Sequence, residues 1–237
     1  KCFLTLPIIF QNHPLNFVQL SSKFFSFLEK IEFNDTNSVQ NIELNTSGSV
    51  QSASMSNSDV YNAVVQWAVE FCESVVDSVV VGGEFDLLQI VYNAIQSKTF
   101  AKTIWTTKFE KKIRKIVRNT TFNSSKSEVA IQLIQCALSY QICDISIISD
   151  LCRALNSQLA NIRFTVVKLV ADSIVLKDLK IIEFVENNVM TQLQALLQDE
   201  LFIADQTLRI LSGATEMKKD LIRLIVKPQV ISLIFGR

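Results

Sequence analysis

The segment NIRFTVVKLVADSIV, at residues 161–175, has the pattern that decides the fold. Its apolar residues recur every three or four positions, which places Ile162, Val166, Leu169 and Val170 on one face of a helix. The spacing therefore predicts an amphipathic helix over 161–175.

Two other segments carry similar apolar stripes, EVAIQLIQCALSY at 128–140 and IADQTLRILSGATE at 203–216. The stripes comprise Val129, Leu133, Cys136, Ala137 and Tyr140 in the first, and Ala204, Leu208 and Leu211 in the second. The three segments start 33 and then about 41 residues apart, which leaves room for a shorter helix, such as 145–156, or a helix pair between them. A repeat of this length made only of helices is typical of a stacked α-solenoid.

The phrases NIRFTVVKLVADSI and IVKPQVI, the latter at residues 225–231, resemble those of armadillo and HEAT repeats. In that family a polar turn led by Asn or Asp opens a helix with apolar residues around an Arg. The next repeat opens around a phrase similar to Ile-Val-x-Pro-x-Val-Ile. The resemblance covers about 125–237 by these motifs and 59–118 by helical pattern, and it implies an all-α, right-handed α-solenoid. The Gly that separates the first two armadillo helices is missing from most sites, so armadillo, HEAT and an irregular helical bundle all remain open.

Five Gly and three Pro in 237 residues predict long helices with short connections, because these residues end helices and form turns. We expect N-terminal helices within 1–33 and repeats over 59–237. The first repeat helix runs from an Asp59 N-cap to Gly82–Gly83, followed by helices at 85–97 and 100–118 with a break near Thr106–Thr107. The segment 34–58 is rich in Ser and Asn and predicts a flexible insertion. Because the chain starts with Lys1, we expect it to be part of a longer protein.

The sequence offers little for catalysis or metal binding. Its single histidine, His13, lies in a turn-like QNHPLN, and no phosphate-binding glycine loop is present. The five cysteines have no CxxC spacing and predict reduced, largely buried thiols in an intracellular protein of the cytoplasm or nucleus; they are Cys2, Cys72, Cys136, Cys143 and Cys152. No run approaches the ~20 apolar residues that span a bilayer. We therefore expect no enzyme activity, metal, cofactor or membrane span.

The segment KFEKKIRKIVRN, at 108–119, is the most basic part of a chain whose 23 basic and 23 acidic residues balance. At 100° per residue, its apolar residues share one helical face that we expect to be buried: Phe109, Ile113, Ile116 and Val117. Five cations follow the next face and form the predicted basic ridge: Lys108, Lys111, Lys112, Lys115 and Arg118. Arg114 lies apart from both. The ridge fits a solvated outer face, an acidic protein partner or a nucleic acid.

These observations favour a non-enzymatic protein-interaction scaffold or adaptor within a larger complex. An acidic segment, a peptide or a partner helix would bind the ridge or the exposed polar positions of the repeats, which are Asn161, Arg163, Lys168, Asp172, Gln206 and Arg209. One alternative is a nucleic-acid-binding repeat protein that uses 108–118. Another is a transport or chaperone-cofactor adaptor, although the Trp and Asn ladder of a transport carrier is reduced here to Trp67 and Trp105. The oligomeric state stays open.

Overall fold

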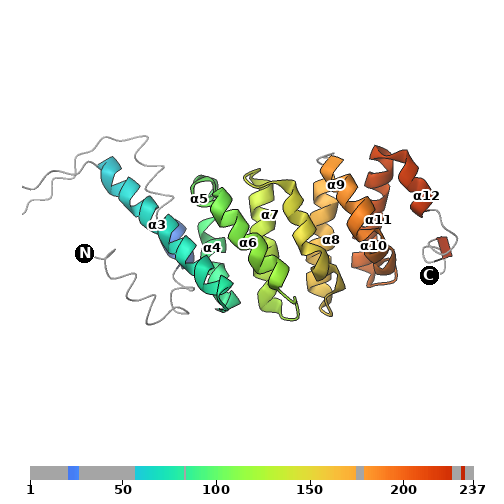
Figure 1. Cartoon of the computed structure of the whole chain (residues 1–237), viewed down its shortest axis with the longest axis horizontal. Coiled ribbons are helices and arrows are strands. Elements are labelled where there is room, and N and C mark those ends of the chain that lie inside the picture. Colours follow the sequence, from blue (N-terminus) through green and yellow to red (C-terminus); the bar gives the residue numbers. More distant parts are fainter. Residues whose placement is uncertain (1–20, 27–56, 83, 175–178, 226–230, 233–237) are drawn as a thin grey trace, which may run out of the picture. The chain divides into compact units, whose positions relative to one another are not determined.

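The computed structural model describes residues 21–26, 57–82, 84–174, 179–225 and 231–232 (Figure 1). Every regular element in these ranges is a helix, and they contain no β-strand. The prediction of an all-α fold is therefore confirmed for this part of the chain. Most of 1–33 and nearly all of the insertion predicted at 34–58 lie outside the described residues. The last two residues of that insertion, Asn57 and Ser58, belong instead to helix α3 (Asn57–Val80).

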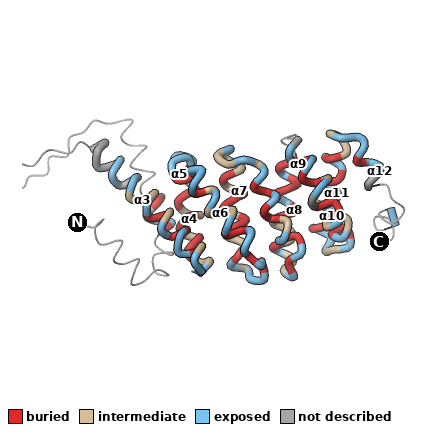
Figure 2. Tube along the Cα trace, viewed as in Figure 1, coloured by how far each residue is buried: buried red, intermediate tan, exposed pale blue. Residues whose placement is uncertain are grey.

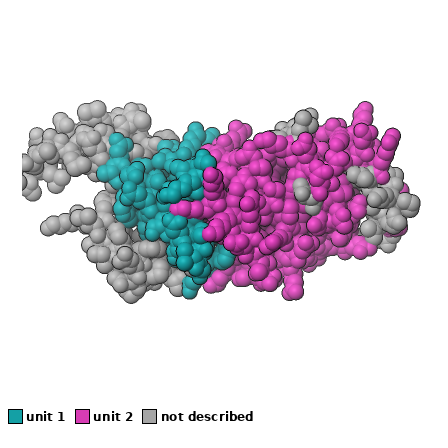
Figure 3. Space-filling view, in the orientation of Figure 1, with its two compact units in different colours: residues 1–109 teal, residues 110–237 magenta. Residues whose placement is uncertain are grey.

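The chain divides into two compact units, residues 1–109 and 110–237 (Figure 3). The division falls inside helix α6 (Thr107–Asn119), so the basic segment contributes residues to both units. Each unit is described below by itself.

Unit 1 contains α3 and a series of short helices, in the order expected from the sequence. After α3 come η1 (Phe85–Leu87), α4 (Leu88–Ala94), α5 (Lys98–Ile104) and the first residues of α6. Helix α3 begins two residues before Asp59, which therefore lies in its first turn and is not the predicted N-cap. Gly82 ends α3 as predicted, with a φ of +110° that side chains other than glycine rarely adopt. The predicted break near Thr106 is also confirmed, and the Thr106 hydroxyl accepts a hydrogen bond from the Phe109 N–H at 3.1 Å.

The core of unit 1 is aromatic on one side of α3. Trp67 stacks on Phe71 with ring centroids 5.2 Å apart, and the edge of Phe24 meets Trp67 at 5.7 Å. Phe25 contacts Phe100 of α5 at 6.1 Å, which joins the segment 21–26 to the core of the unit. The apolar residues at helical spacing on this side of α3 are buried at Ala68, Phe71, Val75 and Val79, whereas Trp67 is half-buried.

Unit 2 contains the three segments that look alike in sequence, now α7 (Glu128–Ser139), α8 (Ala160–Ile174) and α11 (Leu201–Met217). The rest of α6 and a short 3₁₀ turn, η2 (Ser125–Ser127), precede α7. Between α7 and α8 lies η3 (Ile145–Asn156), which is helical as expected but of the tighter 3₁₀ type. Between α8 and α11 come α9 (Leu179–Phe184), a π-helical turn (Val185–Val189) and α10 (Met190–Leu196), and η5 (Lys219–Leu221) and α12 (Ile222–Ile225) follow α11.

Helix α8 is the centre of unit 2, because it contacts α7, η3, α9 and α11 (Figure 1). The edges of Phe164 and Phe202 meet at 5.1 Å between α8 and α11. A Cβ atom added at Gly213 of α11 would lie 2.5 Å from Ile174 Cγ2, so the glycine permits a closer approach of the two helices than another residue would. Figure 2 shows the buried positions recurring along α7, α8 and α11.

The stripe predicted on α11 is buried at Ala204 and Leu211, with 5% and 3% of their surfaces exposed, and is wrong at Leu208. Leu169 of α8 is buried as expected, with 3% of its surface exposed, but Leu208 is 39% exposed and was wrongly placed in the core. An offset of 41 residues pairs the buried positions of α8 with those of α11, whereas the stripe in the sequence analysis used 42. One residue turns a helix by 100°, which carries Leu208 off the buried face.

The thiol of Cys72 lies at the centre of unit 1 and gives a testable pH dependence. Cys72 is fully buried on α3, and this burial raises the pKa of the thiol to about 12. In the unfolded chain it ionises near its ordinary pKa of about 8.5–9, so alkaline pH favours the unfolded state. The stability that depends on this thiol is fully present below that value and is lost as the pH rises towards 12.

We expect the free energy of unfolding of the wild-type chain to fall by about 1.4 kcal/mol per pH unit between pH 9 and 11 relative to a Cys72→Ala variant. Urea unfolding at several pH values measures this difference in slope. Burial also raises the pKa of Cys143 to about 12, but Cys143 is present in both proteins and cancels. If the free energies of unfolding of the two proteins changed with pH in parallel, Cys72 would titrate in the folded chain as it does in water.

Candidate interaction surface

The apolar face of α6 is buried as the sequence predicts. Phe109, Ile113, Ile116 and Val117 are each at most 5% exposed, and Phe109 belongs to unit 1 while the other three belong to unit 2. The cations of the same helix therefore lie on its remaining surface. The structure divides them into paired and unpaired groups, which the helical angle alone does not separate.

Arg114, which the sequence placed apart, is at the centre of a charged network in unit 2. Its guanidinium donates to Glu110 Oε1 at 2.9 Å, to Asp150 Oδ2 at 3.0 Å and to the Ser146 hydroxyl at 2.9 Å. The Arg114 side chain is 16% exposed and that of Asp150 is 5% exposed. Burial alone would lower the pKa of Arg114, but the hydrogen bonds and charges of Glu110 and Asp150 outweigh it and raise that pKa.

Arg118 belongs to the same network and is not a free member of the ridge. Its Nε donates to Asp150 Oδ1 at 2.6 Å, although its side chain stays 62% exposed. Arg153 of η3 donates to the carbonyl oxygen of Arg118 at 2.9 Å. In unit 1, Lys108 forms a 3.3 Å ion pair with Glu73 of α3. Lys108 and Arg118 are therefore exposed, as predicted for the ridge, but each has an acidic partner within the chain.

Lys111 and Lys115 are exposed cations on α6, as predicted. Both are exposed and lie one helical turn apart in unit 2, and within the described ranges neither forms an ion pair. Lys112 between them is half-buried and has an interaction of its own. We call Lys111 and Lys115 the lysine pair. Because α6 holds six basic residues and one acidic residue, the surroundings of the pair remain positive after the ion pairs are formed.

The polar residues predicted to be exposed on the repeat helices differ in their exposure. Arg163 is not an exposed contact residue, because its side chain is only 16% exposed. It forms a bidentate ion pair with Asp199, in which Nε donates to Oδ2 at 2.6 Å and Nη2 donates to Oδ1 at 2.7 Å. The hydrogen bond to Asp199 raises its pKa. Arg163 therefore links α8 to the residue two positions before α11, and its expected exposure is corrected.

The remaining members of that group are on the surface. Asn161 is exposed and donates to Glu128 Oε2 of α7 at 3.1 Å. Lys168 forms an exposed 2.7 Å pair with Asp172 one turn later. Arg209 is exposed and donates to Gln206 Oε1 at 3.0 Å, while Gln206 itself is half-buried. These side chains lie along α8 and α11, but each of the five has a partner within the chain.

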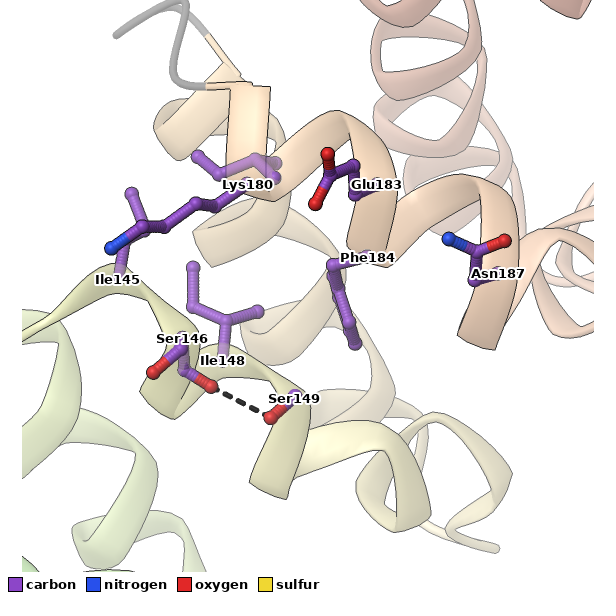
Figure 4. A pocket seen from close by; sticks show the side chains of 9 residues that line it. Ile145, Ser146, Ile148, Ser149, Lys180, Glu183, Phe184 and Asn187 are labelled. Carbon is purple, nitrogen blue, oxygen red and sulfur yellow. Dashed lines mark hydrogen bonds between the residues drawn. The ribbon is translucent and has the colours of Figure 1, made fainter.

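A cavity of about 300 Å³ lies between η3 and α9 of unit 2 (Figure 4). Ile148 from η3 and Phe184 from α9 point into it from opposite sides, and Ser149, Glu183 and Asn187 border it. At one end Lys180 pairs with Asp144, the N-cap of η3, at 2.8 Å. The Lys180 hydrogen bond, followed by that from the Ser146 backbone, holds the pKa of Asp144 well below its usual range. The sequence does not reveal this site, because its two walls, at Ile148 and Phe184, lie 36 residues apart and neither carries a motif.

The described residues hold no group of His, Cys, Asp and Glu placed to bind a metal ion. His13 lies outside them. Among the described helices, none combines the length and the apolar character that crossing a membrane requires. No protein-family model, no curated protein and no solved structure matches this chain.

Proposed function

We propose that this chain is a non-enzymatic interaction scaffold or adaptor, built as a right-handed α-solenoid of armadillo- or HEAT-like repeats. The observation that carries the proposal is a set of lateral contacts in unit 2 with a nearly constant sequence separation. The ion pairs Arg114–Asp150, Lys180–Asp144 and Arg163–Asp199 each join residues 36 positions apart. Lys218–Glu186 joins residues 32 apart, and Asn161–Glu128 joins residues 33 apart.

A constant separation is what stacked repeats produce, because each residue meets the neighbour that lies one repeat earlier or later. In an irregular bundle the separations between contacting helices vary with the connections. The contact of α8 with both α7 and α11 agrees with the same arrangement. Stacked helices present an extended surface, and such folds bind proteins through it. We place this scaffold in the cytoplasm or nucleus, as part of a larger complex.

The lysine pair supports an acidic protein segment as one partner. Lys111 and Lys115 project from a helix on which three further cations, Lys108, Arg114 and Arg118, already have acidic partners. Their charge therefore contributes little to folding and is available to an acidic segment. Proteins that bind single-stranded nucleic acid combine cations with exposed aromatic side chains. Among the described residues of α6, no large aromatic side chain is exposed.

The test is the Lys111→Glu/Lys115→Glu variant. We expect it to bind a short fluorescent glutamate-rich peptide at least about tenfold more weakly than the wild type, with the difference shrinking as salt is added. Fluorescence anisotropy measures the affinity. The melting temperature should stay close to that of the wild type, because neither lysine forms an ion pair within the described residues.

The matched control is Lys98→Glu/Lys102→Glu, which makes the same charge change at two exposed lysines one turn apart on α5. It should leave peptide binding close to wild type. Equal losses in both variants would show a response to net charge alone, and the assignment to α6 would then fail. Binding of a single-stranded oligonucleotide with a steep salt dependence, lost only in the α6 variant, would favour the nucleic-acid alternative instead.

A further inference from the structure

The cavity between η3 and α9 has an apolar floor and a polar border (Figure 4). Ile148 and Phe184 face each other across the floor, and both are buried. Ile145 of η3 and Ile181 of α9 line it as well. The volume of about 300 Å³ lies at the lower limit of ligand-binding cavities. It accommodates one aromatic ring with a short chain but not an α-helix, whose diameter is about 10–12 Å.

The wall on the α9 side contains an irregular helical turn. Residues Val185–Val189 form a π-helical turn between α9 and α10, the single such turn among the described residues. Asn187 at the border of the cavity belongs to this turn, and Phe184 on the floor directly precedes it. Single π-helical turns are rare and frequently mark functional sites. The irregularity of the helix thus coincides with the cavity.

One end of the cavity is negatively charged. Glu183 and Asn187 border that end, and within the described ranges neither forms a hydrogen bond or an ion pair. Lys218 forms an ion pair with Glu186 at 2.5 Å, and this hydrogen bond is the main cause of the raised pKa of Lys218. The charges of Asp220 and Glu183 raise that pKa further. Three carboxylates therefore act on one ammonium group, which leaves the surroundings of Glu183 with a net negative charge.

The opposite end of the cavity is neutral, because Lys180 pairs with Asp144 there at 2.8 Å. The chain enters α9 at Leu179, next to Lys180. Glu183 and Asn187 lie about 6 Å and about 12 Å further along the helix axis, so the negative end is remote from this point of entry (Figure 4). An occupant that matches the cavity brings a positive charge to the negative end and apolar surface to the floor.

We propose that this cavity binds a free aromatic amine, a small molecule in which a single aromatic ring carries a protonated amine on a short chain. The ring lies between Ile148 and Phe184, where contact with the Phe184 ring adds to the burial of apolar surface. The amine donates hydrogen bonds to the Glu183 carboxylate and to the Asn187 amide oxygen. The proposal depends neither on the repeat stacking nor on the lysine pair.

The experiment titrates the full chain with 2-phenylethylamine and measures binding by isothermal titration calorimetry. We expect a dissociation constant below about 1 mM. Two comparison ligands separate the contributions: 3-phenylpropionate has the ring with a negative charge, and propylamine has the amine without the ring. Each should bind at least about tenfold more weakly than 2-phenylethylamine, the first through charge repulsion and the second through lost apolar burial.

Two variants test the floor and the charge of the cavity. Ser149 is exposed at the border, and Ser149→Trp should weaken 2-phenylethylamine at least about tenfold because the indole ring occupies the space of the ligand. Glu183→Gln should weaken it about threefold to fivefold, as is usual for the loss of an exposed ion pair. Binding of the uncharged ring compound benzyl alcohol should not change in Glu183→Gln.

The matched control is Glu84→Gln, which makes the same charge change at an exposed glutamate of unit 1. It should leave the binding of 2-phenylethylamine unchanged. Circular dichroism confirms that each variant is folded.

Four results would overturn the proposal: no binding of 2-phenylethylamine, equal binding of the amine and the carboxylate, unchanged binding in Ser149→Trp, or equal losses in Glu183→Gln and Glu84→Gln. Tighter binding of the blocked dipeptide N-acetyl-phenylalanyl-lysine amide would also overturn it and assign the cavity to a segment of a protein. Binding of the glutamate-rich peptide at Lys111 and Lys115 is a separate titration on a different helix, so the two proposals can fail independently.

Discussion

The Asp150→Ala variant is expected to lower the free energy of unfolding by about 3 kcal/mol, because it removes one partner of a buried ion pair. The Asp150 side chain is 5% exposed and accepts hydrogen bonds from both Arg114 and Arg118. Its loss leaves Arg114, whose side chain is 16% exposed, with Glu110 as its remaining acidic partner. That remaining partner keeps the expected effect at the lower end of the range of about 3–5 kcal/mol for broken buried pairs.

Urea unfolding followed by circular dichroism measures this loss. Asp172→Ala is the matched control, since Asp172 pairs with Lys168 on α8 but both side chains are almost half exposed. Exposed pairs contribute about 0–1 kcal/mol, so the control should unfold close to wild type. A similar small loss for both variants would show that Asp150 is solvated in solution.

The second large effect is expected for Leu169→Ala, at about 2–5 kcal/mol, from lost burial and the cavity left behind. Leu208→Ala is its counterpart: the same substitution on the neighbouring helix, at a side chain that is 39% exposed. We expect the loss for Leu208→Ala to stay below about 1 kcal/mol, as is usual for surface positions. Equal losses would mean that α11 adopts the register with Leu208 in the core.

Sequence patterning predicted the helices because burial imposes a period that can be read locally. The stripes of α3, α6 and α8 contain enough apolar residues to fix both the helix and its buried face. The stripe of α11 was predicted correctly at Ala204 and Leu211 and wrongly at Leu208, since Leu208 is apolar and Thr207, the buried residue beside it, is not. Thr207 is accommodated because its hydroxyl donates to the Ile203 carbonyl oxygen within the helix at 2.8 Å.

The charged contacts could not be predicted in the same way. A helical wheel places Lys108 and Arg118 on one face of α6, but it carries no information about Glu73 or Asp150, which lie 35 residues before and 32 residues after them. Those partners depend on how the helices pack, and the local sequence does not distinguish Glu73 or Asp150 from the other acidic residues of the chain. The exposure of Lys111 and Lys115 was predicted correctly, because the helical angle that buries the apolar face of α6 leaves these two positions on its surface.

The constant separation of the lateral contacts in unit 2 also determines how this part of the chain would respond to a mechanical load. Each ion pair between its helices closes a loop of 32 to 36 residues. These loops overlap along the chain, so under tension the rupture of one contact releases only the residues that the next contact does not also enclose. At about 3.3–3.6 Å per extended residue, a full loop of 36 residues would span about 120–130 Å, and each single rupture would release less than that. Because neighbouring loops share residues, the contacts of this unit resist a load jointly.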